Sequence, residues 1–298
     1  MHALVTGGTG FIGSALVPAL KRHGYSVTVL TRTPKESAPE VNYVTQLEDV
    51  KQPVDAVINL AGASLAAKRW SESYKAQIVA SRVAFTERLV KWMLSQSQIP
   101  STFLSGSAIG YYGDRGEEVV NEGSHRGQGF SAELCEMWES AALALDKRED
   151  CRVCVLRTGV VFDRDGGALT EMIRSFRFGV GTWLGSGEQY LSWIHRADVV
   201  RAMLFLLDEP GAAGAINLVA PHPVTHRDFC RTLSARKPTL LNLGVPDFAA
   251  RLLVGEMADE LLLSGQRVEP RALQTLGFKF RFESLDSALI DIVSRTKR

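Results

Sequence analysis

The chain has 298 residues, of which 45% are hydrophobic and 22% are charged, a balance typical of one large globular domain or two unequal ones. Its 34 basic and 33 acidic side chains give a net charge of +1, so no excess positive field attracts nucleic acid or anionic lipid, and we expect neither as a partner. No apolar run reaches the roughly 18–20 residues of a membrane helix. Because the first predicted strand starts at residue 2, we expect a cytoplasmic protein without a signal peptide.

Strands and helices alternate through the first half of the sequence. Short apolar runs predict the strands, and apolar residues at steps of three and four predict the helices between them. This alternation is typical of a parallel sheet covered on both faces. The predicted strands are 2–6, 26–31, 55–60, 101–106 and 152–157, and the predicted helices are 11–23, 71–95 and 131–147.

Two of the four cysteines, Cys151 and Cys154, form a C-x-x-C at the fifth predicted strand. Residues three apart on a strand point to opposite faces of the sheet, so the two thiols do not converge. That geometry argues against a redox pair or a zinc site. We interpret both cysteines as packing residues and predict no metal.

The second half of the sequence is less regular. The pattern predicts an α/β fold, a Rossmann-like doubly wound parallel sheet with helices on both faces, plus a smaller, mostly helical C-terminal substrate lobe. Further helices are predicted over 168–178, 197–208 and 225–236, a strand over 214–219 and a short edge strand over 277–282. The predicted boundaries are 1–165 for the sheet domain, completed by about 195–220, and 166–194 with 221–298 for the lobe.

A glycine-rich turn follows the first strand. Gly7, Gly10 and Gly13 have the G-x-x-G-x-x-G spacing, between a predicted strand and a predicted helix. In such a turn the first glycine permits a tight bend, the second permits close approach of a phosphate, and the third permits close helix packing. The free N–H groups of the helix then hold a pyrophosphate. The predicted dinucleotide contacts are Gly7, Gly8, Thr9, Gly10, Phe11, Ile12 and Gly13.

The end of the second strand indicates which dinucleotide is bound. An acidic residue there would select NAD through the ribose 2′-hydroxyl, but the sequence reads Val29-Leu30-Thr31-Arg32. The Arg32 guanidinium suits a 2′-phosphate, which favours NADP(H) as the cofactor. The alternative is that Arg32 is a solvated loop residue.

Two further segments are candidates for the cofactor site. The third strand runs into Leu60, Ala61 and Gly62, and the small residues of this segment permit a ligand to cross the strand ends. On the following helix, Arg82 falls within an apolar stripe, where a guanidinium needs an anion or a path to solvent. A cofactor phosphate or ribose and solvent are equally good partners on position alone.

These motifs resemble the short-chain dehydrogenase/reductase superfamily, in particular its extended branch of sugar-nucleotide epimerases and reductases. The resemblance covers about residues 1–220. It includes the glycine turn, Asn59-Leu-Ala-Gly62, Ser105-Gly-Ser107 followed by Tyr112-Gly113, and Trp193-Ile-His195-Arg-Ala-Asp198. Later segments, Leu263–Pro270 and Gly277–Phe280, are similar to an atypical "epimerase family" subgroup with an extra C-terminal domain. The resemblance implies that Thr31, Arg32, Leu60, Ala61, Arg82 and the backbone near Val161 contact NADP.

The resemblance fails at the residues that carry the superfamily's chemistry. Its members use a Tyr-x-x-x-Lys pair on the helix after the serine strand, in which Lys lowers the Tyr pKa. None of the six tyrosines here has a lysine four residues later. The remaining catalytic candidates are Ser107, Tyr111, Tyr112 and His195. Each also has a structural interpretation, as a strand-end hydroxyl, a packed turn or a helix-start hydrogen bonder.

Two functions therefore remain open from the sequence. The first is an NADP-dependent oxidoreductase or epimerase that acts on an unidentified small molecule, for which a sugar-nucleotide-like compound is one option. The second is a non-catalytic NADP(H) sensor, which the missing pair favours. Trp183, Tyr190 and Trp193 lie among glycines near His195, which is typical either of a small-molecule pocket or of ordinary core.

Overall fold

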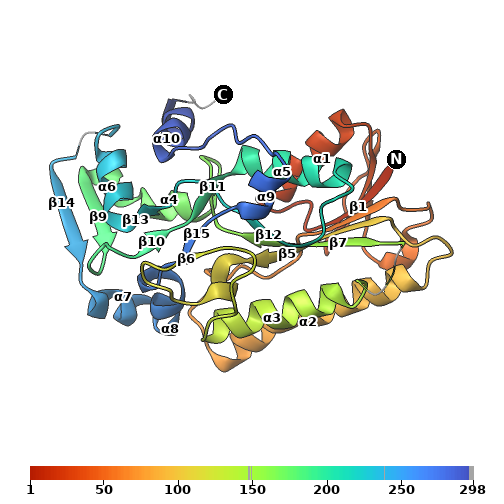
Figure 1. Cartoon of the computed structure of the whole chain (residues 1–298), viewed down its shortest axis with the longest axis horizontal. Helices are drawn as coiled ribbons and strands as arrows, with labels where there is room; N and C mark the ends of the chain where they lie inside the picture. The colour runs from red at the N-terminus through yellow and green to blue at the C-terminus, as the bar shows by residue number, and fades with distance from the viewer. Residues whose placement is uncertain (147, 149, 238, 295–298) are drawn as a thin grey trace.

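Seven parallel strands form the central sheet of the protein, in the order β12-β7-β5-β4-β1-β2-β3 (Figure 1). The computed structural model describes residues 1–146, 148, 150–237 and 239–294. The chain leaves β1 toward β2 and β3 on one side and returns to β4, β5, β7 and β12 on the other, so the topology reverses between β1 and β4. The strands are β1 (His2–Thr6), β2 (Ser26–Leu30), β3 (Val41–Val44), β4 (Ala56–Asn59), β5 (Thr102–Ala108), β7 (Arg152–Thr158) and β12 (Gly214–Leu218).

Helices cover both faces of this sheet, as Figure 1 shows, which confirms the predicted doubly wound fold. Successive strand residues point to opposite faces: Val5 packs in the core beneath α1 and α5, and Leu4 packs in the core beneath α2 and α3. Cys154 lies in the first core and Cys151 in the second, so the two thiols are on opposite faces. The covering helices are α1 (Gly13–Arg22), α5 (Arg196–Asp208), α2 (Glu72–Leu94) and α3 (Phe130–Leu143).

Helix α3 begins at a contact with the distant C-terminal part of the chain. Its N-cap is Gly129 (φ 97°), which has no side chain that could cap the helix. Instead, the Glu260 carboxylate accepts hydrogen bonds from the backbone N–H groups of Phe130 (3.1 Å) and Ser131 (3.0 Å). A negative charge at this position satisfies two unpaired donors and complements the helix dipole. The predicted C-terminal end of this helix, residue 147, lies outside the described residues.

The second half of the chain forms a third core beside the sheet, built around Phe162, Trp193 and Phe229. Three two-stranded sheets belong to this half: β8 (Val160–Phe162) with β11 (Trp193–His195), β9 (Val180–Leu184) with β14 (Leu241–Val245), and β10 (Tyr190–Leu191) with β13 (Val224–Thr225). A further pair, β6 (Val119–Val120) with β15 (Arg267–Val268), packs with Ile109 and Tyr112 in a separate small cluster. The helices of this half are α4 (Ala168–Met172), α6 (His226–Ser234), α7 (Asp247–Val254), α8 (Glu256–Ala258), a π-helical turn (Asp259–Leu263), α9 (Arg271–Thr275) and α10 (Leu285–Ser294). Short 3-10 helices lie at Leu47–Asp49, Ile109–Tyr112 and Ser175–Phe178.

Two predicted elements are wrong in this region. The predicted single helix over 168–178 is instead α4 followed by a 3-10 helix. The backbone hydrogen bonds there span three residues and not four: Arg177 N–H donates to the Arg174 carbonyl, and Gly179 N–H donates to the Phe176 carbonyl. The edge strand over 277–282 does not form. Its backbone donors at Arg281 and Phe282 bond to the Asp198 carboxylate at 2.8–3.1 Å, so a side chain replaces the partner strand.

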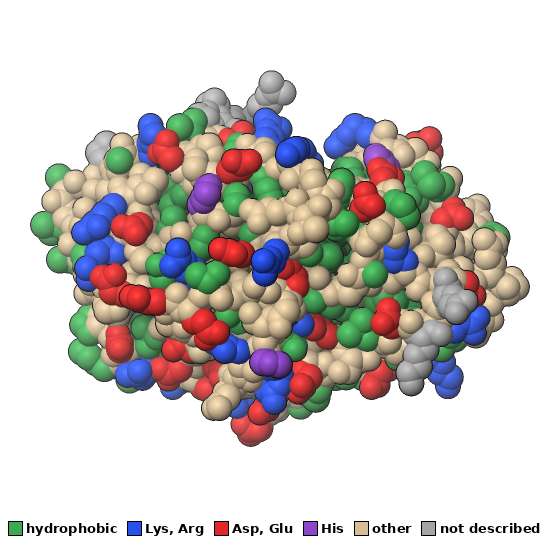
Figure 2. Space-filling view, viewed as in Figure 1, with side chains coloured by type: hydrophobic (Ala, Val, Ile, Leu, Met, Phe, Trp, Pro, Cys, Tyr) green, Lys and Arg blue, Asp and Glu red, His purple; other side chains and the backbone are tan. Residues whose placement is uncertain are grey.

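No helix in the described part of the chain combines the length and the apolar character needed to span a bilayer. Figure 2 shows acidic and basic side chains interspersed over one face of the molecule. This distribution matches the net charge of +1 and gives that face no field of a single sign.

Candidate functional site

The glycine turn lies where β1 ends and α1 begins, next to the point at which the strand order reverses. Gly7 has a φ of +67°, and a Cβ there would lie 2.5 Å from the Leu60 carbonyl oxygen. A Cβ at Gly13 would lie 2.3 Å from the Gly7 oxygen. Glycine is therefore required at both positions, and Thr9 and Gly10 are left exposed at the tip of the turn. The cradle that these residues form is open to a ligand phosphate.

A chain of buried hydrogen bonds holds the end of β4 beside this turn. The Thr6 hydroxyl donates to Asn59 Oδ1 at 2.7 Å and accepts from the Ala61 backbone N–H at 3.2 Å. The Asn59 amide in turn donates to the Thr86 hydroxyl of α2 at 2.9 Å. Leu60 and Ala61 are consequently fixed against Gly7, where the sequence predicted that they would be.

Arg82 reaches from α2 to the segment after β4. A Cβ at Gly62 would lie 3.0 Å from the Arg82 guanidinium carbon, so a glycine at this position leaves room for the Arg82 side chain. The guanidinium stacks over Trp138 at 5.2 Å and makes one long hydrogen bond, of 3.5 Å, to the Ile78 carbonyl. Burial lowers its pKa, and no carboxylate of the described residues pairs with it. The positive charge is therefore available to an anionic ligand.

Thr31 and Arg32 follow β2 at the same carboxyl edge of the sheet. The Thr31 hydroxyl bonds to the Thr33 carbonyl at 3.2 Å and so stays within its own turn. Arg32 is exposed, and it forms no ion pair with any residue in the described ranges. Both residues are thus accessible at the edge where open α/β sheets bind ligands.

Val161 lies close to Phe11 of the glycine turn. It belongs to β8, and its carbonyl is 2.9 Å from the position that a Cβ at Gly167 would take. The same Cβ would be 2.7 Å from the Phe11 ring. The structure therefore brings Val161 and Phe11 to one small region, although they are 150 residues apart in the sequence.

Ser107 is the penultimate residue of β5, and its hydroxyl points toward a buried ion pair. The hydroxyl donates to Glu139 Oε1 at 2.6 Å. Glu139, on α3, accepts two more hydrogen bonds of 2.8 Å from Arg157 on β7. Although burial alone lowers the pKa of Arg157, bonding to Glu139 raises it above its usual range. Because its proton is engaged, Ser107 can meet a ligand only as a hydrogen-bond acceptor in this arrangement.

The two candidate tyrosines have different surroundings. The Tyr112 hydroxyl is fully buried, where it donates to Asn217 Oδ1 at 2.7 Å and accepts from Arg157 at 3.0 Å. Burial raises the pKa of Tyr112 to about 12, so this phenol is a poor proton donor to a substrate. Tyr111 is half-buried, with the Arg157 guanidinium 3.5 Å from the centre of its ring. No residue of the described part of the chain hydrogen-bonds to its hydroxyl.

His195 does not face an open site. Its side chain is fully buried, Nδ1 accepts from the Ala197 backbone N–H at 3.0 Å, and Nε2 is 3.3 Å from Asp291 Oδ2. It caps the start of α5 and packs against Phe282 with the ring centres 4.1 Å apart. Trp193 is also fully buried, stacked on Phe162. Tyr112 and His195 are thus both fully buried and bonded within the core, and neither side chain faces an open site in this arrangement.

The sequence interpretation missed Glu139 and Arg157, the partners of Ser107. A signal for the pair exists in the sequence. Arg157 interrupts the apolar run of β7, and Glu139 interrupts the buried face of α3 formed by Leu134, Cys135 and Trp138. One acid and one base on two elements that pack together predict a buried ion pair, because either charge alone would be costly.

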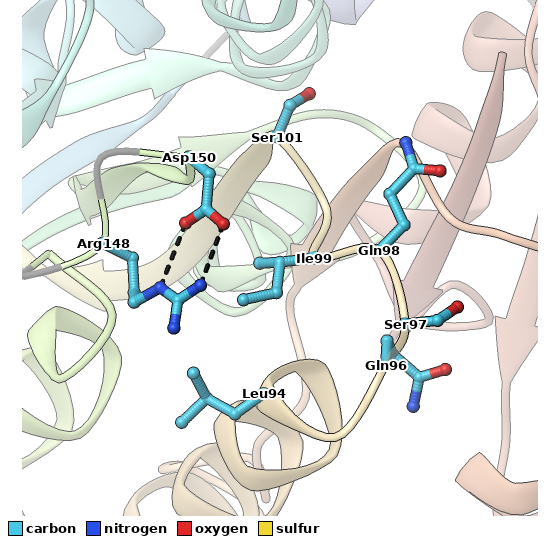
Figure 3. A pocket seen from close by; sticks show the side chains of 8 residues that line it. All are labelled: Leu94, Gln96, Ser97, Gln98, Ile99, Ser101, Arg148 and Asp150. Atoms are coloured by element: carbon cyan, nitrogen blue, oxygen red, sulfur yellow. Dashed lines mark hydrogen bonds and ion pairs between the residues drawn. The ribbon is translucent and has the colours of Figure 1, made fainter.

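Two surface hollows lie away from this site. One, of about 520 Å³, is lined by residues 94–101 together with Arg148 and Asp150, which form a two-point ion pair (Figure 3). Ser101 precedes β5 and Asp150 precedes β7, so this hollow is at the amino-terminal edge of the sheet. The other, of about 740 Å³, lies between α2 and α3. Neither contains a residue of the glycine turn, and we do not assign the site to them.

The fold and the glycine turn define a Rossmann-like α/β protein whose ligand edge is assembled from β1, β2 and β4. The model of the NAD dependent epimerase/dehydratase family matches residues 3–218, and the domain of unknown function DUF1731 matches residues 245–292. The chain belongs to the NAD dependent epimerase/dehydratase family, within the short-chain dehydrogenase/reductase superfamily.

Similar proteins occur in bacteria, plants and humans. An epimerase family protein of Mycobacterium leprae is 38% identical over 96% of this chain and 93% of its own. The chloroplastic epimerase family protein SDR39U1 homolog of Arabidopsis thaliana is 38% identical over 97% of this chain and 86% of its own. The crystal structure of human epimerase family protein SDR39U1 with NADPH is 32% identical, has a TM-score of 0.90, and covers 99% of this chain and 100% of that one.

Proposed function

We propose that this protein binds NADP(H) at the glycine turn and acts as an oxidoreductase or epimerase on a small molecule. The observation that carries the proposal is the pair of guanidinium groups, Arg32 and Arg82, that border the turn without a carboxylate partner among the described residues. The human relative crystallised with NADPH supports it. The turn would hold the pyrophosphate, and Arg32 would take the 2′-phosphate in place of the acidic residue that selects NAD.

The chemistry would divide between the cofactor and the residues at the end of β5. NADP(H) supplies hydride transfer at its nicotinamide ring. Ser107 would orient the substrate by accepting a hydrogen bond from its hydroxyl, since the serine's own proton is held by Glu139. Tyr111 remains our candidate proton donor, because its hydroxyl is not engaged by the described residues. The Tyr-x-x-x-Lys pair is absent, so this proton transfer would be non-standard.

A net charge of +1 argues against nucleic acid or an anionic membrane as a partner. We propose a cytoplasmic protein with a small-molecule substrate. We propose that residues 166–194 and 221–298 form the lobe that contacts this substrate.

Cofactor binding is the first test. We expect NADPH at 100 times its dissociation constant to raise the free energy of unfolding by about 2.7 kcal/mol, and NADH to raise it much less. Titration of the cofactor-free protein followed by thermal unfolding measures both effects. Arg32→Gln should reduce the preference for NADPH, whereas Lys35→Gln, in the same loop, should not. The absence of a shift with either nucleotide would refute the proposal.

A non-catalytic NADP(H) sensor is the second candidate. It is favoured by the engagement of Ser107 with Glu139 and by the burial of Tyr112, which leave few groups for acid/base work. The two functions are separated by offering the NADP-loaded protein a panel of metabolites and following both NADPH formation and conversion of each metabolite to an epimer, because epimerisation forms no net NADPH. Activity that is lost in Ser107→Ala supports the enzyme. Silence across the panel, together with a partner that binds only the loaded protein, supports the sensor.

A further inference from the structure

A tight hairpin formed by residues 163–167 lies on the glycine turn. Asp163 and Gly166 form an isolated antiparallel bridge, and Gly167 has a φ of +74°. A Cβ at Gly166 would lie 3.1 Å from the Phe11 ring, and one at Gly167 would lie 2.7 Å from it. Two consecutive glycines therefore allow the backbone of the hairpin to rest directly on Phe11.

Arg196, the first residue of α5, fixes the hairpin in this position. Its guanidinium lies 3.1 Å from Asp163 Oδ2 and 3.3 Å from Asp165 Oδ2. It also donates to the Phe11 carbonyl at 3.3 Å and stacks over the Phe11 ring at 4.9 Å. Both carboxylates of the hairpin are thus engaged by Arg196, and the hairpin is tied to the turn at two points.

Arg164 stands between these two aspartates and pairs with neither. Its Nη1 atom is buried and has no hydrogen-bond acceptor among the described residues. The residue forms no ion pair within the described ranges either. Arg164 is half-buried as a whole, but a buried guanidinium nitrogen without an acceptor costs free energy unless a ligand or a water accepts its hydrogen bond.

We propose that Arg164 is an anion-binding residue that donates to a phosphate oxygen of the ligand held on the glycine turn. This inference rests on the proposed function. Residues 7–13 contain no basic side chain, and the first turn of α1 contains no acidic one, so a cation carried by the hairpin meets no charge of the turn's own. The phosphate belongs to the pyrophosphate of NADP(H) or to a phosphorylated substrate beside it. Arg196 is the positioning residue, because it ties the hairpin that carries Arg164 to Phe11 of the turn.

The test compares Arg164→Gln with the matched control Arg174→Gln. Arg174 is a nearby arginine with a 75% exposed side chain and one long contact, of 3.7 Å, to Glu171. Dissociation constants for NADPH and for UDP, a probe for a substrate diphosphate, are measured separately by calorimetry. Melting temperatures are measured without ligand. We expect Arg164→Gln to weaken NADPH binding by about tenfold to a hundredfold and the control to leave it unchanged.

The ligand-free melting temperature separates a ligand role from a structural one. If Arg164 awaits an anion, Arg164→Gln leaves the ligand-free protein as stable as before or more stable, and Arg164→Lys restores part of the affinity. Weaker binding of UDP alone would assign the phosphate to the substrate. The inference is overturned if Arg164→Gln binds both ligands as the wild type does. It is also overturned if Arg164→Gln and Arg164→Lys both lower the melting temperature measured without ligand. A wild-type protein that binds no NADPH overturns the proposed function instead.

Discussion

The orientation of the Ser107 hydroxyl is set by a buried ion pair and not by solvent, because the hydroxyl donates to Glu139. The side chains of Arg157 and Glu139 are 5% and 6% exposed, and they are joined by two hydrogen bonds. Removal of one member of such a pair typically costs about 3–5 kcal/mol, because the other charge is left in the interior. The pair is therefore tightly constrained, and so is the direction in which the Ser107 proton points.

Tyr112 and Tyr111 are adjacent but are predicted to respond differently to loss of the hydroxyl. We expect Tyr112→Phe to lower the free energy of unfolding by about 1–3 kcal/mol, since Asn217 loses a donor and Arg157 loses an acceptor, both buried. Tyr111→Phe should change it by less than about 0.5 kcal/mol. Urea denaturation of the two variants measures this difference. Equal destabilisation would show that the Tyr112 hydrogen bonds do not stabilise the fold.

At the scale of single elements, the cap of α3 links the N-terminal and C-terminal parts of the chain. We expect Glu260→Ala to lower the free energy of unfolding by about 1–2 kcal/mol, because two backbone donors at the start of the helix lose their acceptor. Glu256→Ala removes a 46% exposed carboxylate paired with Lys75, so its effect should stay below about 1 kcal/mol. Thermal and urea unfolding of both variants make the comparison. If Glu256→Ala proves the more damaging, the cap contributes little.

The strands that the sequence predicted correctly are the buried ones. Strands β1, β4 and β7 are almost entirely buried and each contains an apolar run of at least three residues, so the cost of exposing them fixes their place in the sheet. Strands β3 and β14 were missed because they are short and partly or largely exposed. Their pairing depends on neighbours distant in the sequence, and their own composition carries little of that information.

The glycine turn could be predicted from the sequence because the three glycines of its motif lie within seven residues. The partners of Ser107 could not, because Glu139 and Arg157 are 32 and 50 residues further along the chain. The sequence alone did not single out Arg164, because its two neighbouring aspartates look like its natural partners. The structure shows that Arg196 pairs with both of them, which leaves Arg164 without a carboxylate among the described residues. The local geometry of the turn could therefore be predicted from the sequence. Which charged side chains pair with each other could not, because that depends on residues distant in the sequence.

At the scale of the whole molecule, one edge of the surface is apolar. Leu241 and Leu243 of β14 are 58% and 50% exposed, and Phe248 of α7 is 71% exposed. Figure 2 shows hydrophobic side chains along the edge that β14 and α7 occupy in Figure 1. No charged residue occurs in β14, so this edge lacks the usual protection against pairing with other chains.

This edge should set the solubility of the protein. The isoelectric point is about 7.7, and the net charge that keeps molecules apart is smallest there. We expect aggregation, followed by light scattering as the pH is varied, to be greatest near that value. Leu243→Lys should suppress it more than Leu94→Lys, which adds the same charge at a 46% exposed leucine on α2. Equal suppression would mean that charge alone, and not the β14 edge, is responsible.

The carboxylate that caps α3 also has a consequence for how the protein is made. Glu260 is 130 residues beyond Phe130, the first residue of the helix that it caps. At about 5–20 residues per second, a ribosome takes roughly 7–26 seconds to synthesise that interval. During this time α3 can be completed by its own backbone except at its first turn, where two donors wait for an acceptor still to be translated. The cap of α3 can therefore form only after the chain has been synthesised as far as Glu260.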